Sequence, residues 1–202
     1  MPTDLDLANV ALALLGESPL ASLSDDRKAA TVVAPRIALV RDALLRSHPW
    51  NFAITRAALA VVAEAPAFGY SYAFALPTDY LRVMQVNDGR THYEIERQGP
   101  IRVLLANDSS VNLRYISRVE NPSAWDPLFF EAMAAALALD SCMAILGSDT
   151  DAYSRTRSLF VDRLELARSM DGQENTPGEA FDDDFLSAWH GGSHYRSIGE
   201  PT

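Results

Sequence analysis

The chain has 202 residues, 48% of them hydrophobic and 22% charged, which suffices for one ordinary globular core with appendages and leaves no room for a second full domain. Its formal net charge of -10 makes the surface repel a nucleic-acid backbone, and no run of lysine or arginine supplies a basic stripe. The amino terminus lacks a cationic region, the apolar runs are shorter than about 20 residues, and Cys142 is the one cysteine, so we expect an intracellular protein without signal peptide, membrane span or intrachain disulfide.

Two helices are predicted at the beginning of the chain. Thr3 is a good N-cap for the first helix, and Gly16 is expected to end it. Ser24 is expected to cap a second, longer helix, whose buried side carries apolar residues at helical spacing. Pro35 should kink this helix, because proline removes one hydrogen bond of the ladder and clashes with the preceding turn.

The second helix leads into the stretch RDALLRSHPWNFAITRAAL, which contains a corner. Pro49 pushes His48 out of the α region, so the helix must end near Ser47. Trp50 and Phe52 follow as large aromatic anchors, which we expect to plug one end of the core. We interpret His48 as a hydrogen-bonded corner residue rather than a catalytic base, since no cysteine or aspartate neighbours it in the sequence.

Residues 53–119 change from a helical to an alternating pattern, which is typical of strands. Aromatic residues recur at every second position in the first part of GYSYAFALPTDYLRVMQV, and a turn at Pro77 interrupts the run. Turn signals with asparagine, aspartate and glycine separate the segments that follow. We predict a small antiparallel β-sheet of four or five strands, inserted between helices. The residues expected on its half-buried faces are Tyr93, Ile95, Val111, Leu113 and Tyr115.

A helical hairpin is predicted after the strands. Asp126 is at the N-cap and Pro127 at the first position of a helix that is apolar on nearly every side until Gly147, so we expect it to be buried all round. The last long helix, residues 150–170, should pack antiparallel to residues 127–146. The fold class is therefore α+β and mainly helical. We expect a four-helix bundle-like core from residues 1–52 and 120–170, a β-rich insertion at 53–119, and an extended acidic C-terminal tail at 171–202.

The predicted tail contains seven acidic residues and one arginine. It lacks the bulk to fold alone, but large apolar side chains stand among its acids and glycines, a composition typical of segments that become ordered on a partner. We predict that the tail binds a partner, with Trp189 as the main anchor; the alternative is that it packs on its own subunit. The predicted partner-binding residues are Phe181, Phe185, Leu186, Trp189 and Tyr195.

Few residues indicate catalysis or ligand binding. His190 and His194 have a spacing that suits a metal on a helix, but two glycines stand between them and no third ligand is signalled. The aspartates at 182–184 form an acidic run of a kind that is more often solvated than metal-binding. No glycine-rich phosphate loop or nucleophile elbow is present. We predict a protein that is not an enzyme and holds no cofactor or metal; a metal-dependent hydrolase built on the histidines and the acidic run is a further hypothesis.

The order of these motifs resembles one known family. An opening helix ANVALALLGE, a second helix leading to RDALLRSHPWNFAITRAAL, and then GYSYAFALPTDYLRVMQV are similar to the head-to-tail adaptor proteins of tailed bacteriophages, in particular tail tubular protein A of short-tailed phages and its relatives. The matching order covers most of residues 1–90. The combination of HPWNFA with YAFALPTDYLRV carries the resemblance, because each half alone is a weak pattern.

The resemblance implies a structural virion protein at the head-tail junction, made in the cytoplasm of the host bacterium. Such an adaptor (connector) forms a ring, usually a dodecamer, that binds the portal protein, joins the capsid to the tail nozzle or tail tube, and continues the channel for DNA ejection. DNA passes through this channel, and no membrane is bound. We expect acidic or neutral residues along the channel, since sliding DNA tolerates few arginine-phosphate contacts. The alternative is a small cytoplasmic ligand-binding or regulatory protein that holds its ligand on the β-sheet.

Overall fold

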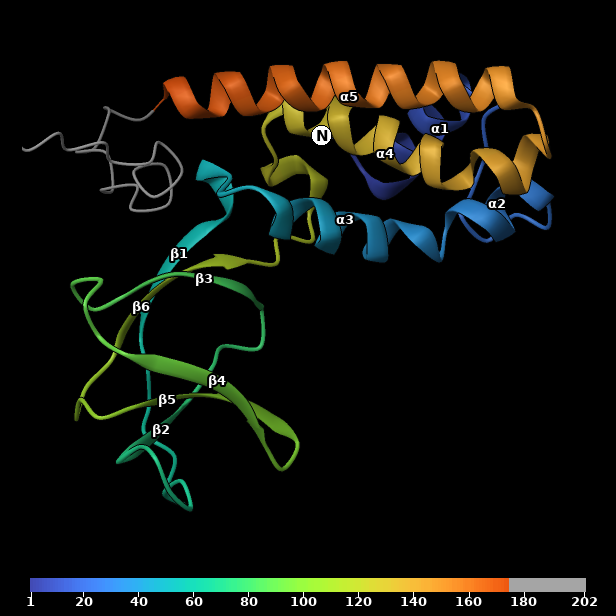
Figure 1. The fold of residues 1–202 in the computed structure, drawn as a ribbon. Coiled ribbons are helices and arrows are strands. Elements are labelled where there is room, and N and C mark those ends of the chain that lie inside the picture. Colours follow the sequence, from blue (N-terminus) through green and yellow to red (C-terminus); the bar gives the residue numbers. More distant parts are fainter. Residues whose placement is uncertain (175–202) are drawn as a thin grey trace, which may run out of the picture.

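The computed structural model describes residues 1–174. A β part projects from one end of a helical part (Figure 1), so the predicted α+β class is confirmed. The helices are α1 (Asp4–Leu14), α2 (Lys28–Val33), α3 (Arg36–Ser47), α4 (Pro127–Leu146) and α5 (Thr150–Gln173), with short 3-10 turns at Asn51–Ala53 and Pro122–Ala124. The strands are β1 (Ile54–Ala58), β2 (Tyr72–Ala75), β3 (Tyr80–Val86), β4 (Tyr93–Gln98), β5 (Ile101–Ala106) and β6 (Asn112–Ser117).

The first helix begins and ends where the sequence predicts. Thr3 Oγ1 accepts a hydrogen bond from the backbone N–H of Asp6 at 3.2 Å, and Asp6 Oδ2 accepts one from the backbone N–H of Thr3 at 2.8 Å. This reciprocal pair is a capping box. Gly16 ends the helix with φ at 76°, a left-handed conformation that glycine adopts without steric strain. Leu7 and Leu12 of α1 are fully buried in the helical core.

The second predicted helix starts later than expected and is divided in two. Ser24 is not its N-cap, because α2 begins at Lys28. The carboxylate of Asp25 instead accepts a hydrogen bond from the backbone N–H of Arg27 at 3.1 Å, which holds this part of the chain in a turn. Pro35, which has no N–H, interrupts the ladder and separates α2 from α3 at the predicted place.

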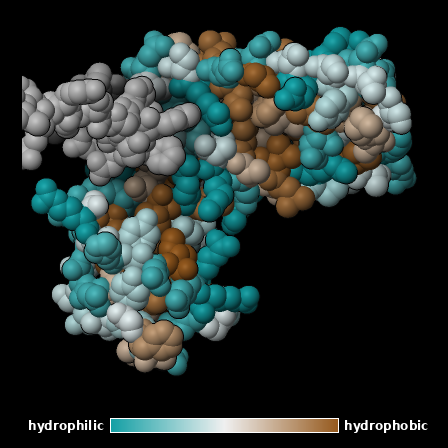
Figure 2. All heavy atoms as spheres, viewed as in Figure 1, coloured by the Kyte–Doolittle hydropathy of each residue, from teal (hydrophilic) through white to brown (hydrophobic). Residues whose placement is uncertain are grey.

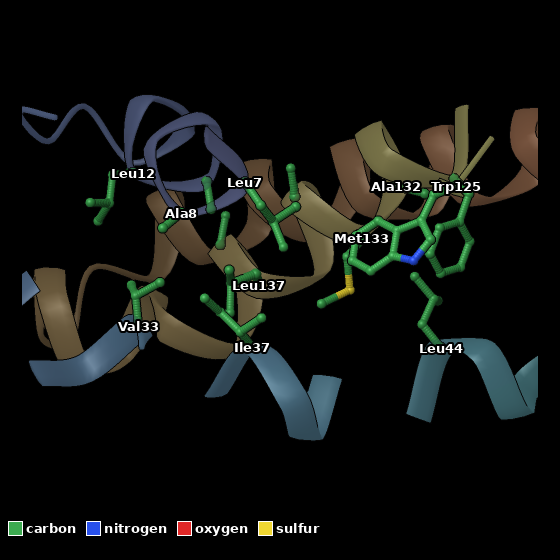
Figure 3. Close-up of a cluster of buried hydrophobic side chains, with 14 of the residues drawn as sticks. Leu7, Ala8, Leu12, Val33, Ile37, Leu44, Trp125, Ala132, Met133 and Leu137 are labelled. Atoms are coloured by element: carbon green, nitrogen blue, oxygen red, sulfur yellow. The ribbon is translucent and has the colours of Figure 1, made fainter. Parts of the chain in front are cut away.

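α4 is the central helix of the helical part. Asp126 is its N-cap and accepts from the backbone N–H of Leu128 at 2.8 Å, Pro127 is its first residue, and Gly147 ends it, as predicted. Every residue from 132 to 138 is buried, because α1, α2, α3 and α5 all contact this helix. Figure 3 shows apolar side chains of α1, α2 and α3 gathered around Leu137.

α5 packs antiparallel along α4, which confirms the predicted hairpin (Figure 1). Its N-cap is Asp149, whose carboxylate accepts from the backbone N–H of Ala152 at 2.8 Å. The helix continues to Gln173 and therefore includes Asp171. The predicted start of the tail, residue 171, is too early, because α5 continues past Met170 to Gln173.

Within residues 1–174, α4 is the one helix that is long and apolar enough to cross a membrane, with a window of mean hydropathy 1.7. From the sequence we expected apolar runs shorter than about 20 residues and no membrane span. In the fold, 56% of that window is buried inside the protein. Packing against the other helices therefore accounts for the apolar composition of α4.

The strands form two three-stranded antiparallel sheets, with the orders β1-β6-β3 and β2-β5-β4, where one sheet of four or five strands was expected. The turn at Pro77 is present, and its carbonyl accepts from the backbone N–H of Tyr80 at 3.1 Å. This turn carries the chain from one sheet to the other instead of forming a hairpin. The two sheets enclose a small second core that includes Phe74, Leu104, Leu113 and Tyr115.

The faces predicted for the strands are correct in part. Val111, Leu113 and Tyr115 are 2%, 1% and 3% exposed, as expected for core positions. Tyr93 and Ile95 are 39% and 40% exposed. These two residues lie on β4, an edge strand of its sheet, in which residues 93–97 are all exposed.

Candidate functional site

The corner in HPWNFA is built around a buried tryptophan. His48 is extended, with φ -142° and ψ 151°, as expected for a residue before proline. The Trp50 side chain is 1% exposed, and its indole N–H donates to the carbonyl of Leu44 at 3.1 Å. The Trp50 ring packs edge-on against the ring of Phe129 on α4 at a centroid distance of 4.9 Å. The ring of Phe52 packs against the same Phe129 ring, also at 4.9 Å. Trp50 and Phe52 therefore close one end of the core, as predicted.

The end of α5 holds this corner in place. Asp171 Oδ2 lies 3.1 Å from Nε2 of His48, and Asp171 Oδ1 accepts from the backbone N–H of Asn51 at 2.8 Å. The side-chain amide of Asn51 donates to the carbonyl of Asp171 at 2.6 Å. Arg168, one turn earlier, donates to Oγ of Ser47 at 3.1 Å. The prediction that His48 is a hydrogen-bonded corner residue is confirmed.

His48 is held in its neutral form. Burial lowers its pKa below the usual 6.5, and this effect outweighs the hydrogen bond and negative charge of Asp171, which act in the opposite direction. The positive charges of Arg168 and Arg82 also lower this pKa. At neutral pH the imidazole is therefore an uncharged hydrogen-bonding partner of Asp171, which suits a structural role.

Hydrogen bonds and one ion pair join the helical part to the β part. Arg118, which follows β6, donates from Nε to Oδ2 of Asp42 on α3 at 2.7 Å, and its backbone N–H donates to the carbonyl of Asp79 at 2.7 Å. Arg46 of α3 donates to the carbonyl of Leu81 on β3. Leu81 itself belongs to the core cluster of the helices. The two parts therefore share an interior.

An open cleft lies in the corner between α3 and the β part, with a volume of about 900 Å³. This volume falls within the range of roughly 300–1,000 Å³ that is usual for ligand clefts. The lining comes from α3, the turn between β2 and β3, the hairpin of β4 and β5, and the residue that follows β6. Its exposed and half-buried apolar residues include Leu76, Pro77, Ile95, Pro100 and Ile101, and its charged residues are Asp42, Arg46, Arg102 and Arg118.

The charged lining of the cleft is mainly basic. Asp42 is already paired with Arg118. Arg102 stands directly opposite Arg97 in the register of β4 and β5, and like charges in this position destabilise a sheet. No carboxylate of residues 1–174 forms an ion pair with Arg102. The cleft therefore favours an anionic ligand with an apolar surface.

The exposed face of α3 extends the apolar surface beyond the cleft. Leu39 is 73% exposed, and Pro35, Ala38 and Ala43 are exposed on the same side of the helix. Ala43 also lines the cleft. Figure 2 shows hydrophobic residues reaching the surface over α3. Exposed apolar residues on one face of a helix can serve as a protein-protein contact.

The described part of the chain assembles no recognisable catalytic centre. Among residues 1–174, no three histidine, cysteine, aspartate or glutamate side chains lie close enough to hold a metal ion. Cys142 is buried in α4. Burial and the carboxylate of Asp79 raise the pKa of Tyr115 to about 12, so this phenol keeps its proton. The absence of a cofactor, a metal and an enzymatic activity stays a prediction.

The residues predicted to bind a partner lie outside the described residues. They are Phe181, Phe185, Leu186, Trp189 and Tyr195. The same is true of the acidic run at 182–184 and of His190 and His194, on which the hydrolase hypothesis depends.

No protein-family model matches this chain, and no curated protein matches it. Two features of the site, the cleft and the contact of Asp171 with the corner, were not predicted from the sequence. Both join segments that are far apart in the sequence. The weak signals for the cleft were the turn residues Pro77 and Pro100 and the arginines of β4 and β5.

Proposed function

We propose that this protein is a structural adaptor of a tailed bacteriophage, which forms a ring beneath the portal protein, joins the capsid to the tail and continues the DNA channel. The observation that supports the proposal best is that the two motifs of the family resemblance meet at one junction. Trp50 of HPWNFA and Leu81 of YAFALPTDYLRV belong to the same core cluster. Arg46, just before the first motif, donates to the carbonyl of Leu81.

This contact gives the sequence pattern a structural reason. The first motif ends α3 and turns the chain into β1, and the second motif carries the chain back to α3 through the turn at Pro77. Each motif alone is a common kind of turn, but together they build the connection between a helical part and a β part. A resemblance that covers a contiguous structural unit supports a shared fold better than two unrelated matches do.

In this proposal the helices around α4 form the bundle of the adaptor, the β part is its insertion, and the residues beyond 174 are its extended tail. The junction is fixed at two places, by Asp171 on His48 and Asn51 and by Asp42 on Arg118. A subunit fixed in this way holds the angle between its two parts, which a ring of defined diameter requires. The exposed apolar face of α3 provides a surface for contact between subunits.

The partners in this proposal are further copies of the chain, the portal protein and the tail nozzle or tail tube protein. Phe181, Phe185, Leu186, Trp189 and Tyr195 reach across to the portal or to a neighbouring adaptor subunit. DNA passes through the channel, and the protein resides in the virion. A small cytoplasmic ligand-binding protein is the competing function, and the volume of the cleft is the observation that favours it.

The proposal is tested first by the neighbouring reading frames and then by a binding assay. We expect genes for a portal and a capsid protein beside this one. The purified protein should sediment with portal particles made from the adjacent gene, and light scattering should give a stoichiometry of several copies per portal. Neighbouring genes of metabolism or regulation, or portal particles that sediment without the protein, would contradict the proposal.

A further inference from the structure

We propose that the cleft between α3 and the hairpin of β4 and β5 is the docking site for the acidic, aromatic segment 179–189 of a second copy of this chain. The inference rests on the proposed function, since it gives the ring its contact between subunits. From the sequence, the portal, a neighbouring adaptor and the segment's own subunit are all possible binding partners of this segment. The cleft identifies a neighbouring adaptor as the receptor.

The charge of the cleft favours an acidic segment. Its lining contains three arginines and one aspartate, and that aspartate, Asp42, is paired with Arg118. Arg102 has no carboxylate partner within residues 1–174 and stands opposite the like charge of Arg97 in the sheet. A carboxylate of the bound segment would pair with Arg102 and offset this like charge. Charge complementarity of this kind also fixes the register of the bound segment.

An apolar surface accompanies these charges. Ile95 and Ile101, which line the cleft, are 40% and 41% exposed. Leu76 and Pro77 line the cleft beside them. The volume of about 900 Å³ is large enough for several large side chains of a bound segment.

The segment 179–189, with the sequence EAFDDDFLSAW, has the complementary composition. Phe181 and Phe185 flank three consecutive aspartates, and Leu186 and Trp189 follow. Aspartates between two aromatic anchors match a cleft in which arginines lie beside apolar residues. Asp126 and Glu131 also have aromatic neighbours, but Trp125 and Phe129 are buried in the helical core and are not free to dock.

The last turns of α5 contact Ser47 and His48, which follow Arg46 of the cleft lining. The segment therefore begins near one end of a cleft of this kind. The proposed ring places the segment in the cleft of a neighbouring copy, and analytical ultracentrifugation distinguishes this arrangement from docking in the same copy. Repeated head-to-tail contacts of this kind close into a ring when the rotation between copies permits it.

The direct test measures binding of a labelled synthetic peptide, residues 175–195, to a body that ends after Gly178. We expect saturable binding that weakens as salt is added. Arg102→Glu should lower the affinity at least about tenfold by placing a negative charge in the cleft. Arg90→Glu is the matched control, because it makes the same charge change at an exposed position of the β part outside the cleft. Unchanged affinity in Arg102→Glu, or an equal loss in both variants, would overturn the proposal.

A second measurement distinguishes a neighbouring copy from the same copy. The full-length wild type should self-associate with rising concentration in analytical ultracentrifugation, whereas full-length Arg102→Glu and the body that ends after Gly178 should each stay monomeric. A mixture of these two proteins should form a complex, since one supplies a free segment and the other an intact cleft. A wild type that stays monomeric at concentrations where the peptide saturates the cleft would overturn docking between copies.

The outcome for the docking site is separable from the outcome for the proposed function. If the peptide does not bind the cleft but the full-length protein still forms a ring on portal particles, the docking site is wrong and the adaptor function stands. If the peptide binds and copies associate but no portal interaction occurs, the docking site stands and the adaptor function is wrong.

Discussion

Nε2 of His48 lies 3.1 Å from Oδ2 of Asp171, although the two residues are 123 positions apart in the sequence. The other carboxylate oxygen of Asp171 accepts from the backbone N–H of Asn51. Through these bonds the last turn of α5 fixes the corner at which the chain leaves the helices for the strands. The angle between the helical part and the β part depends on this contact.

Replacing Asp171 by alanine should destabilise the protein. The change removes the carboxylate that bonds to His48 and accepts from the backbone N–H of Asn51, so we expect a loss of about 1–3 kcal/mol in the free energy of unfolding. Urea unfolding followed by circular dichroism measures it. Asp162→Ala, at an exposed position of the same helix, is the control and should change stability by less than about 0.5 kcal/mol. Equal stability of the two variants would show that the corner is held by packing alone.

Stability should fall as the pH is lowered through the titration of His48. Burial lowers its pKa in the folded protein below 6.5, so the unfolded chain binds the proton more tightly. The stabilising contribution is present above pH 6.5 and is lost as the pH falls through the lower pKa of the folded protein. Urea midpoints at several values between about pH 8 and pH 5 should therefore drop more for the wild type than for His48→Gln. Parallel profiles would indicate that another group causes the acid sensitivity.

Leu137→Asp should abolish soluble expression. Leu137 is fully buried at the centre of α4, and an unpaired buried charge costs several kcal/mol, which is comparable to the total stability of about 5–15 kcal/mol of a domain. Leu39→Asp provides the matched control, since Leu39 is 73% exposed on α3. Fractionation of cell lysates should find the control in the soluble fraction and Leu137→Asp in the pellet. Normal folding of Leu137→Asp would show that α4 is not central.

Truncation after Gly178 should leave a folded body that no longer attaches to portal particles. The truncated protein keeps α5 and the contacts of Asp171, so its unfolding midpoint should equal that of the full chain. It loses the aromatic and leucine anchors, each of which contributes roughly 1.5–3 kcal/mol when buried. Truncation after Tyr195 is the control and should retain attachment in a sedimentation assay. Unchanged attachment after removal of residues 179–202 would contradict a docking role of the segment.

The channel of the assembled ring should be acidic or neutral. A duplex that slides through the ring cannot form many arginine-phosphate contacts, because each one holds the DNA in place. Mapping the charged residues on an experimental structure of the ring tests this expectation. A lumen lined by unpaired arginines would refute it.

Local signals predicted most of the helices correctly. Thr3 and Asp126 cap helices as their sequences indicate, and the end of α3 before Pro49 follows from the restriction that proline places on the residue before it. The predicted start of the second helix, at Ser24, was wrong, because Asp25 uses its side chain in a turn. Serine and aspartate favour both helix N-caps and turns, so the sequence does not distinguish the two.

The pairing of the strands cannot be predicted from the alternation of apolar and polar residues alone. The segments of β2 and β3 were located correctly, but whether consecutive strands pair or separate into two sheets depends on contacts with other segments. The cleft is a consequence of that separation, since the turn at Pro77 passes beneath α3 on its way between the sheets. Its residues come from four segments, and no single stretch of sequence carries its pattern.

The adaptor function is best tested by electron microscopy of the purified protein mixed with the portal protein of the same genome. We expect an additional ring of density that is coaxial with the portal channel and composed of many copies of this chain. Portal particles without this ring, together with a protein that stays monomeric in their presence, would contradict it.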